Sequence, residues 1–142
     1  MVVLRSSNEI EGLRRAGDLV ARAFEMLRPH VVPGVGLDEL DRLVEEFLRA
    51  RGAESPYKGY RPAPSIPPFP GTVCASANEQ VVHGIPSRRK LRGGDIVGID
   101  VGPCSVAGSG TPATRTPSEM CLPRQKISWA PPGRAWRRGW RR

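Results

Sequence analysis

The sequence predicts an α+β fold for residues 1–102, followed by a disordered basic tail over residues 103–142. Two amphipathic segments near the start repeat their apolar residues at three- and four-residue steps, as helices do. Short apolar segments follow a proline-rich stretch and predict strands. The last 40 residues contain only three Val, Ile or Leu residues and show neither period, which favours disorder.

The first helix is expected over residues 6–28. Ser6 and Glu9 have the spacing of a capping box, in which each side chain satisfies the backbone N–H of the other. Pro29 then ends the helix. One apolar stripe is predicted to face the core, formed by Ile10, Leu13, Gly17, Val20, Phe24 and Leu27.

A second helix is expected over residues 37–51, with Gly52 as its C-terminal stop. Its charged residues are predicted to lie on the face away from the core. The inward residues are Leu37, Leu40, Val44, Phe47 and Leu48. Neither helix contains residues that suggest chemistry.

Residues 53–72 contain eight prolines and glycines and are expected to form a long ordered loop. Proline lacks the backbone N–H that helices and central strands require. Long loops in compact domains are often functional.

Two strands are expected, over residues 73–77 and 95–101. In the second, two-residue alternation places Ile96, Gly98 and Asp100 on one face, opposite three aliphatic residues. A carboxylate in an apolar strand is costly to bury unless it is paired or binds a metal. This strand is also expected to present an unpaired edge, because the tail has so few apolar residues.

The net charge of +8 is very unevenly distributed. Residues 1–102 carry +1, whereas residues 103–142 carry +7 and all three tryptophans. Arginines and tryptophans are interleaved in residues 134–142, which supports an alternative function in nucleic-acid or ribosome binding through the tail.

The sequence excludes several other classes of protein. No stretch approaches the ~20 apolar residues of a membrane helix, and no secretory signal is visible. The three cysteines include no C-x-x-C pair, which excludes a disulfide framework and predicts a cytoplasmic protein.

Four short motifs occur close together and in order. They are Pro68-Phe69-Pro70, Cys74-Ala75-Ser76-Ala77-Asn78-Glu79, Val81-Val82-His83-Gly84-Ile85-Pro86, and Gly94-Asp95-Ile96-Val97 leading to Ile99-Asp100-Val101-Gly102. Over about residues 3–102 the chain resembles type I methionine aminopeptidases. The resemblance implies an incomplete αββα "pita-bread" fold. It also implies a cytosolic hydrolase that removes initiator methionine from nascent proteins near the ribosome, without specific nucleic-acid or membrane binding.

The resemblance also implies roles for individual residues. His83 matches a catalytic histidine that contacts the substrate beside the scissile peptide, and Asp100 matches the first metal-binding aspartate. Phe69 and Cys74 match residues that line the pocket for the methionine side chain. Without the motifs, His83 would be read as a half-buried structural histidine, Asp100 as a turn cap and Cys74 as a small buried apolar residue.

The family's cofactors are two divalent metal ions (Co, Mn, Fe or Zn) bridged by a hydroxide, which polarise the scissile carbonyl. Five side chains hold them, and this sequence supplies Asp100 alone. Residues 103–142 contain one carboxylate, Glu119, and no histidine. We therefore expect a truncated family member that neither retains the metals nor catalyses.

A frameshift near codon 102 accounts for the abrupt change after Gly102. Degenerate codons for residues 102–112, read from each third base, permit a segment ending in glycine-aspartate. The family places its second metal-binding aspartate in such a segment. On this hypothesis the Arg/Pro/Trp-rich tail is not homologous to the family.

Overall fold

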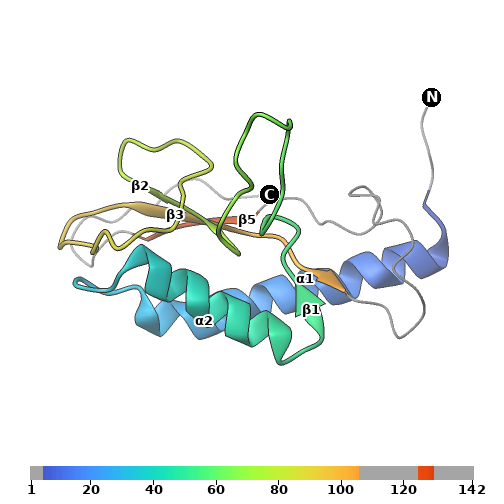
Figure 1. The fold of residues 1–142 in the computed structure, drawn as a ribbon. Coiled ribbons are helices and arrows are strands. Elements are labelled where there is room, and N and C mark those ends of the chain that lie inside the picture. Colours follow the sequence, from blue (N-terminus) through green and yellow to red (C-terminus); the bar gives the residue numbers. More distant parts are fainter. Residues whose placement is uncertain (1–4, 106–124, 130–142) are drawn as a thin grey trace.

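The computed structural model describes residues 5–105 and 125–129, which form an α+β fold with two helices against one face of a small sheet (Figure 1). No helix in these two stretches is long and apolar enough to cross a membrane. In chain order the elements are α1 (Ser7–Leu27), η1 (Arg28–His30), α2 (Leu37–Arg49), β1 (Ala53–Glu54), β2 (Cys74–Ala77), β3 (Val97–Val101), β4 (Cys104–Ser105) and β5 (Gln125–Trp129).

Helix α1 begins at the predicted capping box. The Ser6 N–H donates to Glu9 Oε2 at 2.7 Å, and the Glu9 N–H donates to Ser6 Oγ at 3.3 Å. Val20, Phe24 and Leu27 are buried as predicted. The inward placement of Ile10 is wrong, because its side chain is 49% exposed where the first turns of α1 extend past α2 (Figure 1). Two further stripe residues, Leu13 and Gly17, are only partly buried.

Helix α2 packs beside α1 and buries Leu37, Leu40, Val44 and Leu48, while Phe47 packs partly buried against the same core. One charged residue departs from the predicted outward face. Asp41 is partly buried, and its Oδ1 accepts hydrogen bonds from backbone N–H groups of the segment that leads into β2.

The main sheet is antiparallel with strand order β2-β3-β5. Its register pairs Cys74 with Asp100 and Ala77 with Val97. The residues that pack into the core with the helices are Ala75, Ala77, Val97, Ile99 and Val101. The predicted division of residues 95–101 into two faces is therefore confirmed, and Asp100 lies on the face away from the helices.

The expectation of an unpaired edge on β3 is wrong. Strand β5 pairs with β3 along its whole length, from Val97 opposite Trp129 to Val101 opposite Gln125. The prediction counted aliphatic side chains, whereas a strand ladder is built from backbone N–H and C=O groups. A second small pairing, β1 with β4, adds a short strand where only a loop was predicted. The other tail residues, 106–124 and 130–142, lie outside the described residues, so the expected disorder and the nucleic-acid alternative stay untested there.

Candidate substrate pocket and metal ligand

The proline-rich stretch folds back on itself between β1 and β2. The Gly59 N–H donates to the Phe69 carbonyl and the Phe69 N–H donates to the Tyr60 carbonyl, both at 2.8 Å. Inside this closed loop, the Ile66 N–H donates to the Ala63 carbonyl at 3.0 Å. These bonds satisfy backbone groups that no helix or sheet uses, so residues 59–69 form an ordered wall, as the sequence predicts.

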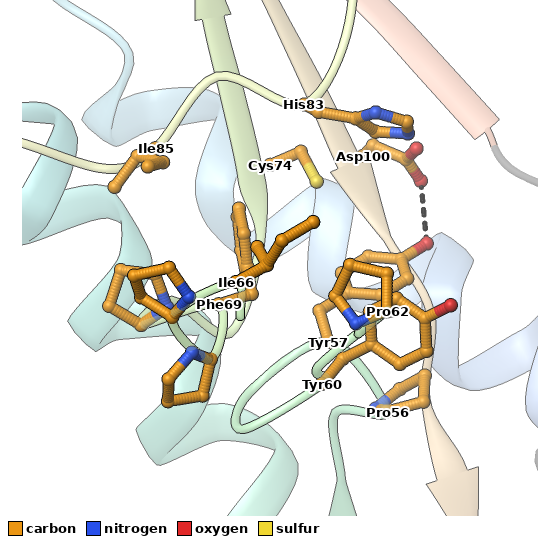
Figure 2. A pocket seen from close by; sticks show the side chains of 13 residues that line it. Pro56, Tyr57, Tyr60, Pro62, Ile66, Phe69, Cys74, His83, Ile85 and Asp100 are labelled. Carbon is orange, nitrogen blue, oxygen red and sulfur yellow. Dashed lines mark hydrogen bonds between the residues drawn. The ribbon is translucent and has the colours of Figure 1, made fainter. Parts of the chain in front are cut away.

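This loop encloses a cavity of about 860 Å³ together with β2, β3 and the segment before Pro86. A cavity of this size is typical of small-molecule and cofactor sites. Figure 2 shows apolar side chains around most of it and a small polar cluster at one end. The lining residues are Pro56, Tyr57, Tyr60, Pro62, Ile66, Pro67, Pro68, Phe69, Pro70, Cys74, His83, Ile85 and Asp100.

All four site residues predicted from the sequence line this one cavity. Cys74 and Asp100 are register partners on β2 and β3, and their side chains are 6% and 9% exposed. Phe69 is half-buried in the loop, while His83 is exposed at the end near Asp100 (Figure 2). The structure thus brings the four residues together in one pocket.

Asp100 is hydrogen-bonded to a residue that the sequence did not single out. The Tyr57 hydroxyl donates to Asp100 Oδ1 at 2.9 Å (Figure 2). A Cβ atom at Gly102 would lie 2.9 Å from the Tyr57 hydroxyl oxygen, so the small residue there leaves room for the phenol. Tyr57, Tyr60, Ile66 and Ile85 are the missed pocket residues. For Tyr57, Tyr60 and Ile66 the sequence signal was their place inside the predicted functional loop, and Ile85 stood in the motif that contains His83.

His83 has a left-handed backbone, with φ of +57°. This region is uncommon for residues other than glycine, and it often marks functional sites. The next residue is held on both sides: the Ala75 N–H donates to the Gly84 carbonyl at 2.8 Å, and the Gly84 N–H donates to Ser76 Oγ at 3.0 Å. Strand β2 therefore fixes the backbone that carries the histidine.

Asp41 anchors the other end of the pocket wall to α2. Its Oδ1 accepts the N–H groups of Thr72 at 2.7 Å and Val73 at 2.8 Å. Partial burial raises the pKa of Asp41 above its ordinary 3.8, and the two N–H donors lower it by less. The carboxylate thus connects the helix layer with the start of β2 at the base of the loop.

The metal-ligating side chains among the described residues do not fit a two-metal site. Within residues 5–105 and 125–129, no group of three or more His, Cys, Asp or Glu side chains is placed to hold a metal ion. Two divalent cations require several carboxylate oxygens and an imidazole. Asp100 is a carboxylate beside the pocket, but it stands without a second carboxylate among the described pocket-lining residues.

Comparison with known proteins identifies the family. The family model for metallopeptidase family M24 matches residues 11–121, most of the chain. The chain belongs to metallopeptidase family M24. Its matched segment continues past Gly102, the residue at which the resemblance was expected to end. The predicted type of fold is confirmed, because the structure forms part of the pita-bread fold of this family.

Several similar M24 proteins are methionine aminopeptidases. Methionine aminopeptidase 1 of Bacillus subtilis is 40% identical over 102 residues, covering 72% of this chain and 39% of the relative. The crystal structure of methionine aminopeptidase from Thermotoga maritima is 34% identical, with a TM-score of 0.66 over 75% of this chain and 41% of the other. A streptococcal methionine aminopeptidase, 23% identical, shares the fold with a TM-score of 0.75 over 92% of this chain and 51% of the other. The chain spans about two fifths of the length of the first two.

Proposed function

We propose that this M24 chain carries the substrate pocket of a methionine aminopeptidase and, as a 142-residue polypeptide, binds an N-terminal methionine without releasing it. The pocket takes the methionine side chain between Phe69 and Cys74. His83 contacts the peptide beside the first peptide bond. In the intact family these residues serve the removal of initiator methionine from nascent proteins, in the cytoplasm and near the ribosome.

The observation that carries this proposal is the convergence of the four predicted residues on one apolar cavity. A flexible thioether side chain packs well against aromatic and aliphatic walls. The few polar groups gather at one end, where the peptide backbone of a substrate would extend from the pocket. The 40% identity to a methionine aminopeptidase supports the same substrate class.

The proposed loss of activity follows from the small number of metal-ligating side chains. Asp100 supplies one of the five ligands that the family uses for its two divalent ions (Co, Mn, Fe or Zn), and a single carboxylate holds such an ion weakly. We therefore propose that the chain does not retain the metals. Without them, the pocket binds the substrate residue and the reaction does not proceed.

The experiment is to mix the purified 142-residue protein with a Met-Ala-Ser peptide, with and without Co²⁺ or Mn²⁺. Saturation-transfer NMR is expected to show contact with the methionine methyl group, and no free methionine is expected. Phe69→Ala should weaken the contact, while Val32→Ala, at an exposed site outside the pocket lining, should leave it unchanged. Sustained methionine release would refute the inactivity, and equal binding of a Glu-Ala-Ser peptide would refute the substrate class.

We further propose that the tail after Gly102 arises from a frameshift. Sequencing the gene around codon 102 tests this directly. One or two inserted or deleted bases should restore a reading frame that encodes the missing metal ligands. Early stop codons in both shifted frames would refute the proposal.

A further inference from the structure

The backbone just after His83 lies against β2 at Gly84. A Cβ atom at Gly84 would collide with the Ala75 carbonyl oxygen and lie 2.7 Å from Ser76 Cα, so the backbone approaches the strand as closely as glycine allows. Two hydrogen bonds hold it there, one to each of these β2 residues. This contact is a fixed point one residue away from the histidine.

The other end of the segment is also held. A Cβ atom at Gly71 would lie 2.8 Å from the ring of Pro86, so proline and glycine are in close contact. Beyond Pro86, the Ser87 carbonyl accepts the Asp38 N–H at 3.0 Å, which joins the segment to the first turn of α2. These contacts all follow His83 in the chain, and on its other side the Gln80 N–H donates to the Ala77 carbonyl of β2 at 3.2 Å. The left-handed His83 therefore lies between backbone groups that are hydrogen-bonded to β2.

Ser76 differs from the other contacts because it acts through a side chain. It is 5% exposed and lies on the pocket side of β2, two residues from Cys74. Its Oγ accepts a hydrogen bond from the buried Gly84 N–H. Without the Ser76 hydroxyl, this N–H would lose that acceptor. An unsatisfied buried N–H is costly, so removing the hydroxyl should loosen the Gly84 backbone at the strand, where the bond from the Ala75 N–H to the Gly84 carbonyl remains.

We propose that Ser76 is a positioning residue for His83. Its hydroxyl fixes the Gly84 N–H, and the Gly84 backbone in turn sets the direction in which the imidazole enters the pocket. Ser76 does not contact the substrate in this role. The binding readout below rests on the proposed function, whereas the exchange and coupling readouts do not.

The test uses the full 142-residue chain and native-state amide exchange measured by NMR. In Ser76→Ala, exchange of the Gly84 amide is expected to rise about tenfold, with a smaller rise at Ala75, while the amides of α2 stay unchanged. The HN–Hα coupling of His83 and its imidazole resonances should change as the backbone leaves φ +57°. Ser76→Thr, which keeps the hydroxyl, should restore both signals.

Thr72→Val is the matched control. Thr72 lies just before β2, is 2% exposed, and its Oγ1 has no hydrogen-bond partner among the described residues. Its loss should change neither Gly84 nor His83. If Ser76→Ala leaves the His83 signals unchanged, or if it raises exchange equally throughout the chain, Ser76 is not a positioning residue.

Peptide binding separates this inference from the proposed function. Ser76→Ala is expected to weaken Met-Ala-Ser binding several-fold, and Thr72→Val to leave it unchanged. If the wild-type chain does not bind the peptide, the proposed function fails. The exchange and coupling measurements still decide the role of Ser76 in that case.

Discussion

Tyr57 and Asp100, separated by 43 residues in sequence, are joined by a hydrogen bond of 2.9 Å at the polar end of the pocket. The bond links the proline-rich loop to β3. It also provides a partner for a carboxylate that is 9% exposed. The loop and the strand therefore hold each other in place at the position where the pocket meets its candidate metal ligand.

Replacing Tyr57 with phenylalanine should destabilise the fold. The variant removes a donor from a buried carboxylate while keeping the ring, and the expected cost is about 1–3 kcal/mol of unfolding free energy. Urea denaturation followed by circular dichroism measures it. Tyr60→Phe is the control, since Tyr60 is 54% exposed and lines the same pocket. Equal stability of the two variants would show that the Tyr57 bond contributes nothing.

Asp41 should make stability fall as the pH rises. Burial raises its folded-state pKa above 3.8, so the folded protein holds a proton that the unfolded chain has already lost. This contribution favours folding below pH 3.8 and is lost as the pH rises through the raised folded pKa. Asp41→Asn keeps an oxygen acceptor for the Thr72 and Val73 N–H groups and should remove this pH dependence.

Asp41→Ala separates the charge from the hydrogen bonds. It leaves two backbone donors without their acceptor, so the expected cost is about 2–4 kcal/mol at neutral pH. Urea melts of the three proteins between pH 3 and 7 provide the measurement. A wild-type profile that matches that of Asp41→Asn would contradict the account of Asp41.

Glu9 should change the dependence of folding stability on pH in the opposite direction from Asp41. The Ser6 N–H is the largest of the causes that lower its pKa from 4.5 to about 2. A lowered pKa means that its stabilising contribution is present above pH 4.5 and is lost as the pH falls toward 2. In Glu9→Gln the start of α1 should no longer respond to pH in this window, as measured by helix content. Glu11→Gln, at an exposed site on the same helix, is the control.

The local features of this fold were predictable, whereas the contacts between distant segments were not. The capping box of Ser6 and Glu9 depends only on residues close together in the sequence. The same holds for the alternation of side-chain direction around Asp100, so sequence spacing reveals both features. The partner of Asp100 comes from an aperiodic loop, where nothing in the spacing indicates which side chain points inward. The acceptor role of Asp41 was hidden in the same way, because a charged residue on an amphipathic helix is normally assigned to solvent.

The pocket residues and the sheet show the same contrast between predictable local features and unpredicted contacts of distant segments. His83, Cys74 and Asp100 were found through ordered motifs, which carry information that periodicity lacks. The pairing of β5 with β3 was missed because it depends on backbone groups that every residue possesses. Only the folded chain brings residues 125–129 against Val97–Val101.

Divalent metals should leave the stability of this chain almost unchanged. A ligand that binds the folded state raises stability in proportion to the logarithm of its concentration over its Kd, and a lone carboxylate has a high Kd. We expect 1 mM Mn²⁺ or Co²⁺ to shift the Tm by less than about 1 °C, and EDTA to have no effect. Asp100→Asn should respond to the metal as the wild type does. A metal-induced rise of several degrees that Asp100→Asn abolishes would show that the chain assembles a metal site after all, and the proposed loss of activity would then have to be abandoned.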